Sequence, residues 1–289
     1  MTGSPSFISP AGAAAAPARA YTPLWRAAAA GLVVLSGVSL PILLVILWLA
    51  TDPPIGPLLL AQLLVLFGLL PAVGAGLVRR ACTSRVELVG PDLVVSRAGL
   101  RVEIPHGAIA RVVPWTLPLP GAGLVLWMRS GKRLHYAIEL DDPAPLLDAI
   151  GGVGGDAALH PTVAYAHARA GRSPWRWYHY AWKFVLFALA PAAIFFNAHQ
   201  HIAYGGPLGE YHLLGLAAYL RTFAVYWGTV AMQLMLFAGL WRALAEPVAL
   251  LTTWLAPARA SRTRRCVEVA CRVLYYGGVP ALVAARFLA

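Results

Sequence analysis

Charged residues are scarce in this chain. Only 12% of the 289 residues are charged and 59% are hydrophobic, with a mean hydropathy of +0.67. Soluble domains carry roughly one-quarter charged residues, so this composition excludes a soluble globular protein and indicates an integral membrane protein. Acidic residues are the less frequent of the two charge types, with 12 Asp and Glu against 23 Lys and Arg. Because basic residues near span ends set membrane orientation, the excess reports topology, and we expect no nucleic-acid partner.

Cysteine is also scarce, and familiar catalytic motifs are absent. Cys266 and Cys271 are five residues apart on an expected helix, about 140° around its axis, which favours neither a disulfide nor a metal clip. The third cysteine is Cys82. The sequence has no Gly-x-Ser-x-Gly, no His-Glu-x-x-His, no phosphate-binding loop and no dinucleotide fingerprint. We therefore assign no catalytic residue and no cofactor, and we favour a non-enzymatic protein over an enzyme.

Long apolar runs are what the chain has instead. Residues 1–26 are rich in Ala, Pro, Gly and Ser without an apolar period, which predicts a disordered tail. Residues 27–50 carry no charge, a length sufficient to cross roughly 30 Å of hydrocarbon. A second apolar run covers residues 55–78. The sequence thus predicts a transmembrane hairpin over residues 27–78.

The second half of the chain is again apolar. Residues 151–178 form a polar linker that ends in aromatic and basic residues, a belt typical of membrane interfaces. Residues 179–289 follow as a C-terminal transmembrane region with interfacial segments, one of them after Pro247. Its three expected spans cover about residues 181–198, 222–244 and 267–288, which makes about five spans in all.

Between these apolar regions, residues 79–150 follow a different pattern. From Arg85 onward, apolar residues alternate or run briefly between turn signals, which is typical of strands. Asp141-Asp142-Pro143 then begins a short helix, because acidic residues favour a helix N-terminus. Strands are expected at 86–89, 93–95, 100–104, 109–113, 124–128 and 134–140, and the helix at 144–150. The predicted fold is an α-helical membrane bundle with an inserted cytoplasmic α+β domain, an antiparallel sheet plus a C-terminal helix.

Four short motifs stand out in this domain: Val86-Glu87-Leu88-Val89 with Leu93-Val94-Val95; Ala98-Gly99-Leu100-Arg101; Ile104-Pro105 with Ile109-Ala110-Arg111-Val112; and Ser130-Gly131-Lys132-Arg133. Together they resemble the bacterial pleckstrin-homology-like (PH-like) domains found beside membrane spans. The resemblance implies a small bent β-sheet closed by a helix, which serves as a docking or assembly surface. The proline-rich residues 114–120 depart from the pattern, which leaves the strand pairing there open.

The basic residues predict an orientation and a binding surface. With the N-terminus, the β domain and the arginines of residues 259–265 on one side, only Arg221 and Arg286 fall near the other. The positive-inside rule makes the first side cytoplasmic in a multi-pass protein of a bacterial inner membrane. Expected partners are the membrane with its anionic lipid headgroups, and another membrane protein or a second copy of the chain. The predicted partner or lipid surface comprises Arg97, Arg101, Arg111, Arg129, Lys132 and Arg133.

Residues 197–212 hold a polar group with metal-ligand character, expected in an outer loop. Its members are His199, His201, Glu210 and His212, and imidazoles with a carboxylate suit a transition metal such as zinc, copper or iron. On a helix, His199 and His201 would point about 200° apart, so a metal site requires the loop. The alternative is that these side chains only satisfy a loop at the membrane surface.

The preferred function is therefore a non-enzymatic membrane protein whose cytoplasmic PH-like domain docks a partner or supports complex assembly. A membrane-embedded enzyme or metal-dependent protein that uses residues 197–212 is the alternative. A transporter component comes third, because the spans contain few polar residues and no visible repeat.

Overall fold

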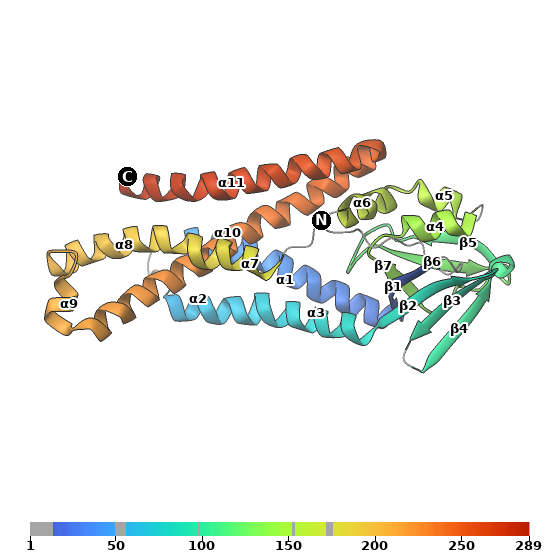
Figure 1. Cartoon of the computed structure of the whole chain (residues 1–289), viewed down its shortest axis with the longest axis horizontal. Coiled ribbons are helices and arrows are strands. Elements are labelled where there is room, and N and C mark those ends of the chain that lie inside the picture. Colours follow the sequence, from blue (N-terminus) through green and yellow to red (C-terminus); the bar gives the residue numbers. More distant parts are fainter. Residues whose placement is uncertain (1–13, 50–55, 98, 152–153, 172–175, 289) are drawn as a thin grey trace. The chain divides into compact units, whose positions relative to one another are not determined.

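The structure, a computed structural model, describes residues 14–49, 56–97, 99–151, 154–171 and 176–288 (Figure 1). The chain divides into two compact units, each built from segments far apart in the sequence. We call them the sheet unit and the helical unit. The sheet unit comprises Met1–Ser36, Leu70–Arg172 and Pro247–Val267. The helical unit comprises Gly37–Leu69, Ser173–Glu246 and Glu268–Ala289.

Within the sheet unit, the described strands form one curled antiparallel sheet in the order β4-β3-β2-β1-β7-β6-β5. Helix α4 (Ala144–Ile150) follows the last strand, as the sequence predicts. The expected strands of residues 85–150 are confirmed, with shifted ends. The strands are β1 (Ala14–Tyr21), β2 (Thr83–Val89), β3 (Asp92–Arg97), β4 (Leu100–Pro105), β5 (Ile109–Pro114), β6 (Gly123–Met128) and β7 (Ala137–Leu140).

Strand β1 corrects the prediction for the N-terminus. A disordered tail over residues 1–26 is wrong for residues 14–26, while residues 1–13 lie outside the described part. β1 pairs with β2 on one side and β7 on the other. Ala18 and Ala20 of β1 are buried, and their small side chains fit a strand that lies between two neighbours. The apolar helical hairpin of α1 and Pro57–Ala81 is therefore inserted in the sequence between the first two strands of the sheet.

A cross-link tests this strand. Pro17 lies directly opposite Arg85 in the β1–β2 register. Opposed residues of antiparallel strands have Cα atoms about 4.5–5.5 Å apart, within the range that a disulfide spans. We expect Pro17→Cys with Arg85→Cys to form a disulfide under mild oxidation, seen as a mass loss of two hydrogens in the linked peptide. Pro17→Cys with Glu87→Cys, two residues out of register, is the matched control, and equal cross-linking of both pairs would contradict the strand.

The concave side of the sheet encloses the core of this unit. Leu93, Ile109, Leu124 and Ile138 are almost fully buried in it, together with Leu147 of α4. Helices α5 (Gly155–Ala158) and α6 (Pro161–Ala170) follow α4 and add Ala157 and Val163 to the same core. The alternation of the strands and the apolar face of α4 thus produce one hydrophobic cluster.

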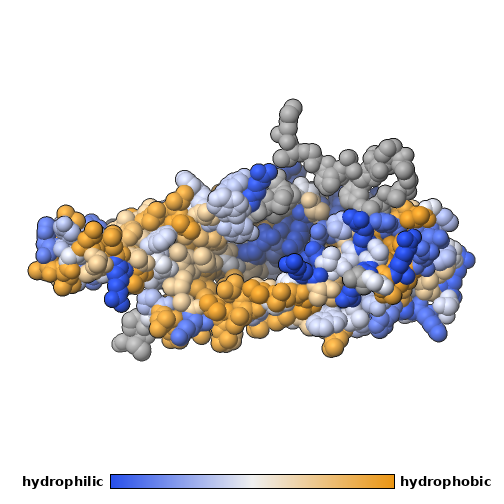
Figure 2. All heavy atoms as spheres, turned by 60° about the horizontal axis from the view of Figure 1, so that its bottom comes forward, coloured by the Kyte–Doolittle hydropathy of each residue, from blue (hydrophilic) through white to orange (hydrophobic). Residues whose placement is uncertain are grey.

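Among the described residues, five helical stretches are long and apolar enough to cross a membrane, in agreement with the predicted number. Their apolar side chains are widely exposed, and Figure 2 shows them as an orange surface along the long helices. The stretches are α1 (Pro23–Leu49); α2 (Pro57–Leu63) with η1 (Leu64–Leu69) and α3 (Leu70–Ala81); α7 (Trp177–Ala181) with η4 (Trp182–Leu186) and α8 (Phe187–Tyr204); α10 (Leu216–Leu255); and η5 (Pro257–Arg259) with α11 (Ala260–Leu288).

Helix α10 is longer than a membrane requires. Its 40 residues extend about 60 Å at 1.5 Å per residue, roughly twice the hydrocarbon thickness. The segment after Pro247, expected as a separate interfacial piece, is the continuation of α10 through this proline. From Pro247 onward, α10 belongs to the sheet unit. There the ring of Trp254 meets that of His160, at the start of α6, edge to face at 5.3 Å.

Strand pairing constrains how the chain can cross a membrane. Because β1 and β2 pair in one sheet, a membrane crossed by α1 must be crossed back by Pro57–Ala81. His160, at the start of α6, contacts Trp254 near the end of α10, and the Arg264 guanidinium lies over the Tyr165 ring of α6 at 5.7 Å. If the chain crosses a membrane, these contacts likewise require an even number of crossings between α6 and the end of α10.

In the helical unit, a π-helical turn in η4 joins three apolar helices. A π-helix makes wider turns than an α-helix and interrupts its regular carbonyl pairing. The Tyr275 hydroxyl of α11 donates to the Lys183 carbonyl at 3.0 Å. The Trp227 indole of α10 donates to the Val185 carbonyl at 3.1 Å. Both acceptors lie in η4, so side chains of α10 and α11 bind the irregular turn.

Candidate functional site

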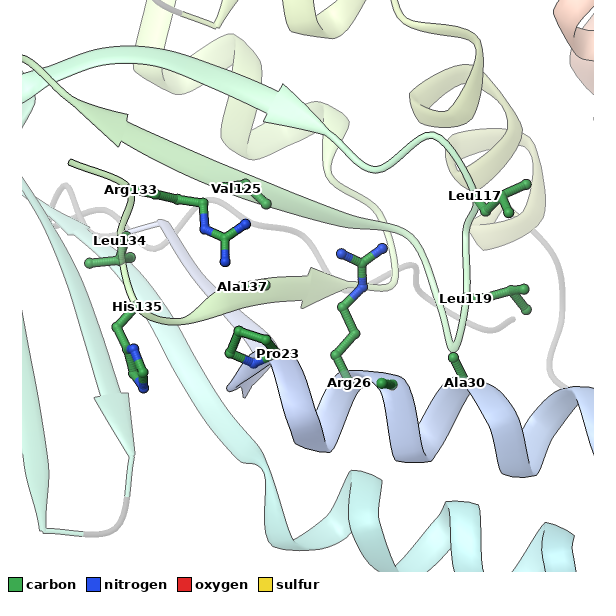
Figure 3. A pocket seen from close by; sticks show the side chains of 11 residues that line it. Pro23, Arg26, Ala30, Leu117, Leu119, Val125, Arg133, Leu134, His135 and Ala137 are labelled. Carbon is green, nitrogen blue, oxygen red and sulfur yellow. The ribbon is translucent and has the colours of Figure 1, made fainter. Parts of the chain in front are cut away.

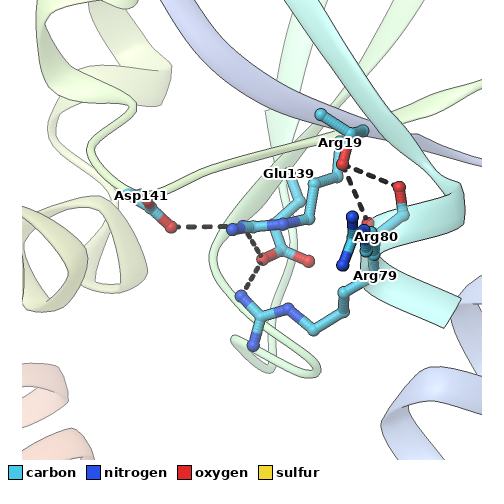
Figure 4. Close-up of polar contacts among 6 residues, drawn as sticks. Arg19, Arg79, Arg80, Glu139 and Asp141 are labelled. Atoms are coloured by element: carbon cyan, nitrogen blue, oxygen red, sulfur yellow. Dashed lines mark hydrogen bonds and ion pairs between the residues drawn. The ribbon is translucent and has the colours of Figure 1, made fainter. Parts of the chain in front are cut away.

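A buried ion-pair network links both ends of the hairpin to the sheet (Figure 4). The Glu139 carboxylate of β7, fully buried, accepts from Arg19 Nη1 of β1 at 2.7 Å and from Arg79 Nη2 of α3 at 2.6 Å. Arg19 also reaches the exposed Asp141 at 3.3 Å. Burial, with the negative charge of Glu139, raises the pKa of the nearby Tyr21 hydroxyl. The network therefore ties β1 and the end of α3 to β7.

A cavity of about 340 Å³ lies between the first turns of α1 and the two loops that flank β6 (Figure 3). Most of its walls are apolar, and Arg26, Arg133 and His135 are its ionisable residues. The full lining is Pro23, Arg26, Ala27, Ala30, Leu117, Leu119, Val125, Arg133, Leu134, His135 and Ala137. The cavity thus combines cationic groups with an apolar wall.

The structure divides the six basic residues that the sequence predicts as a partner surface. Arg97 donates to the backbone carbonyls of Ala20 at 3.4 Å and Ala81 at 3.0 Å, so it stabilises the sheet instead. Arg101 pairs with Glu103 at 2.8 Å. Arg133 lines the cavity beside α1. The remaining three are Arg111, Arg129 and Lys132.

These three residues lie where β5 begins and β6 ends, with Arg111 on the edge strand β5 itself, and we call them the basic edge. β5 is an edge strand, and Arg111 on it lies opposite Trp127 of β6, its guanidinium 4.9 Å from the ring centroid. The Arg129 amide donates to the Ala108 carbonyl just before β5, and the Lys132 carbonyl accepts from the Met128 amide. All three side chains are exposed. Among the described residues, no carboxylate forms an ion pair with them.

The polar group of residues 197–212 does not lie in the one continuous loop that the sequence predicts. Helix α8 continues through Tyr204, and α9 (Gly209–Leu214) begins a few residues later. His201 Nδ1 lies 2.9 Å from the Asn197 carbonyl of its own helix, and the His199 ring packs against Tyr226 at 5.3 Å. The expectation of a loop is therefore wrong for residues 197–204 and 209–212, which are helical, and holds only for residues 205–208. Helix geometry turns His199 and His201 to different faces of α8.

No metal site follows from these histidines. In the part of the chain that the structure describes, no group of three or more His, Cys, Asp or Glu side chains could hold a metal ion. His199, His201, Glu210 and His212 are thus not brought together as ligands. Glu210 is instead buried and accepts from Gln200 Nε2 at 2.6 Å and from Thr222 Oγ1 at 2.6 Å. These bonds hold α9 between α8 and α10.

Sequence reasoning missed two residues that organise the sheet unit, Arg26 and Glu139. Arg26 is the last charged residue before the first apolar run, so its position in the sequence indicates only where that run begins. Glu139 lies in an alternating strand where an outward-facing acid is expected, and its partner Arg19 is 120 residues away in the sequence. No local pattern reports such a pair.

Comparison of the chain with protein-family models, with curated proteins and with solved structures finds no match. The functional assignment therefore rests on the geometry of the chain itself.

Proposed function

We propose that this protein is a non-enzymatic membrane-anchored docking protein, whose sheet unit binds an acidic segment of a partner protein at the basic edge. The observation that carries the proposal is the set of three exposed cations, Arg111, Arg129 and Lys132, where the edge strand β5 begins and β6 ends, without a described carboxylate partner. Clustered charges of one sign raise association rates and select partners of the opposite sign.

The edge strand adds a second reason. Among the described strands, β5 pairs only with β6, so no described strand pairs with the backbone groups along its other side. Extended segments bind sheet edges through such backbone groups in several docking domains. Val113, which is exposed on β5, offers an apolar contact beside Arg111. An acidic extended segment fits this combination of charge and backbone.

The sheet also supports the assignment to PH-like docking domains. Its strand order, with β1 between β2 and β7, and the helix α4 after β7 fit the bent sheet closed by a helix that the resemblance implies. We assign the sheet unit to the cytoplasmic face of a bacterial inner membrane. Most of the 23 basic residues lie in its segments, which supports this orientation under the positive-inside rule.

Site-specific cross-linking in intact membranes tests the docking proposal. A photo-reactive amino acid at Ser130, in the turn between Arg129 and Lys132, should capture one partner reproducibly. We expect Arg129→Glu with Lys132→Glu to reduce that cross-link about tenfold or more, because both attractions become repulsions. Raised salt should weaken the wild-type cross-link as well, since exposed charges are screened.

Arg101→Glu is the matched control, because it reverses one exposed arginine on β4, at the other edge of the sheet. The cross-link should persist in this variant. Capture of a second copy of the chain would show that the docking partner is the same protein in a homo-oligomer. Cross-links to lipid alone, or an unchanged cross-link in the Arg129→Glu and Lys132→Glu variant, would contradict the proposal.

A further inference from the structure

The cavity beside α1 contains two cations that face one another without an acid. In Figure 3, the guanidinium groups of Arg26, from α1, and Arg133, from the connection between β6 and β7, point into the same space. Among the described residues that line the cavity, none is Asp or Glu. Like charges near a low-dielectric wall repel one another, and an anion between them removes that cost. The charge arrangement therefore favours an anionic ligand.

Packing fixes the position of Arg26 before any ligand binds. The Arg26 guanidinium carbon lies 3.7 Å from the ring centroid of Trp115, and Trp115 is only 3% exposed. Gly123 lies against the same ring, because a Cβ atom there would come within 2.6 Å of Cζ2 of Trp115. A cation stacked on a buried aromatic ring is held in place, and a preorganised binding group loses little entropy on binding.

The other walls of the cavity are apolar and favour a ligand with an apolar part. Ala27 and Ala30 contribute from α1, and Leu117, Leu119 and Val125 from the β5–β6 region. A small hydrated anion would leave these walls wet and unfilled. Binding sites of this kind place a few polar groups in a mainly apolar pocket, so the ligand should carry an anionic group and a hydrocarbon part.

The position of the cavity agrees with such an amphiphile. Arg26 lies in the first turns of a helix that is apolar enough to span a membrane, which places it at headgroup depth. One turn beyond it on the same face is Ala30, and one further turn is Val34, which is exposed. Leu117 at the mouth is 56% exposed. An apolar track thus leads from the two arginines along α1.

We propose that the cavity binds one anionic phospholipid, with its phosphate between Arg26 and Arg133 and an acyl chain along Ala27 and Ala30. Basic pockets beside membrane helices are known to bind anionic headgroups. The bound lipid would tie the sheet to the membrane surface at the point where β1 becomes α1. This site shares no residue with the basic edge, so it goes beyond the docking function and is tested separately.

Native mass spectrometry of the full-length protein in detergent provides the test. Phosphatidylglycerol and phosphatidylcholine with the same acyl chains are titrated in parallel. Both headgroups carry a phosphate, but phosphatidylcholine adds a quaternary ammonium that two neighbouring arginines repel, whereas phosphatidylglycerol is a net anion. We therefore expect one molecule of phosphatidylglycerol to bind at least about tenfold more tightly, a difference of roughly 1.4 kcal/mol. Arg26→Gln with Arg133→Gln should lower binding of phosphatidylglycerol to that of phosphatidylcholine.

Two further variants control for a general loss of positive charge and for a failure of the double arginine variant to fold. Lys132→Gln removes a charge one residue from Arg133 but outside the cavity, and it should keep the preference. Ala27→Phe fills the cavity without a change of charge and should abolish binding of both lipids even if the double arginine variant fails to fold. Wild-type protein without a preference, or equal losses in Lys132→Gln and the double arginine variant, would overturn the proposal.

Inorganic phosphate distinguishes the lipid from a free anion. Millimolar phosphate should leave the bound phosphatidylglycerol in place, because phosphate alone cannot occupy the apolar walls. Complete displacement of the lipid by phosphate would show that the cavity selects a soluble anion and would refute the lipid assignment. The docking cross-link at Ser130 should be retained in the Ala27→Phe variant, so failure of one proposal does not imply failure of the other.

Discussion

Glu139→Gln should destabilise the sheet unit by about 3 kcal/mol. The substitution removes the buried charge that accepts from Arg19 and Arg79 at 2.7 and 2.6 Å, while the side chain keeps its size. Removal of one partner from a buried ion pair costs about 3–5 kcal/mol, because the remaining charge is left uncompensated. We expect the lower end of this range, since the two arginine side chains are 27% and 29% exposed and can be partly hydrated.

Thiol labelling of Cys82 measures this loss. Cys82 is 1% exposed and packs near Tyr21 and Trp115 in the sheet unit, so reagent reaches it only when the unit opens. With Cys266 and Cys271 replaced by Ser, Cys82 is the single reporter. A loss of about 3 kcal/mol should raise the labelling rate roughly a hundredfold when opening is in fast equilibrium.

Glu103→Gln is the matched control for this variant. Glu103 also pairs with an arginine, Arg101, at 2.8 Å, but the two side chains are 55% and 65% exposed. Exposed pairs contribute about 0–1 kcal/mol, so labelling should rise only a few-fold. Equal effects of Glu103→Gln and Glu139→Gln would show that burial of the Glu139 network does not stabilise the fold.

Gly123→Ala should produce the second large effect, a destabilisation at or above the upper end of the roughly 1–3 kcal/mol found for overpacked cores. A Cβ atom at Gly123 would lie 2.6 Å from Cζ2 of Trp115 and 2.7 Å from the carbonyl oxygen of Ile138. The carbonyl belongs to β7, which pairs with β6, so it cannot move without separating the strands. The indole is buried and cannot move outward either.

Gly107→Ala is the control for the glycine substitution. Gly107 lies in the short helical turn η2 (His106–Ala108), and an added Cβ would meet nothing within 4 Å. Its stability change should stay within about 0.5 kcal/mol. Cys82 labelling serves as the readout for both variants. If Gly123→Ala labelled no faster than Gly107→Ala, Trp115 would be free to move and Arg26 would not be preorganised for the cavity.

The membrane helices and most strands follow from local patterns that the sequence carries by itself. Long uncharged runs must be helices if they cross lipid, because every backbone polar group needs an internal partner there. Period-two alternation between turn residues likewise predicts β2 to β6, and Asp141-Asp142-Pro143 predicts α4. These features depend on neighbours in sequence, so one chain without relatives is enough to infer them.

Strand β1 shows where such local inference ends. Its residues Ala14–Tyr21 are mostly alanine with one proline, types with low strand preference. They form a strand because β2 and β7 supply hydrogen-bond partners on both sides, and those strands lie beyond the whole hairpin. Helix α10 is similar, since its continuation through Pro247 is supported by packing within the sheet unit and not by its own composition.

The candidate sites divide in the same way. Composition and charge alone predicted a basic surface on the β domain, and Arg111, Arg129 and Lys132 are exposed where β5 begins and β6 ends. Whether a given cation is available depended on contacts that only the tertiary structure sets: Arg97 bonds backbone carbonyls, Arg101 meets Glu103, and Arg133 turns toward Arg26. The sequence determined which elements form, because that depends on nearest neighbours. The tertiary structure decided which side chains meet, because those pairs join residues up to 122 positions apart.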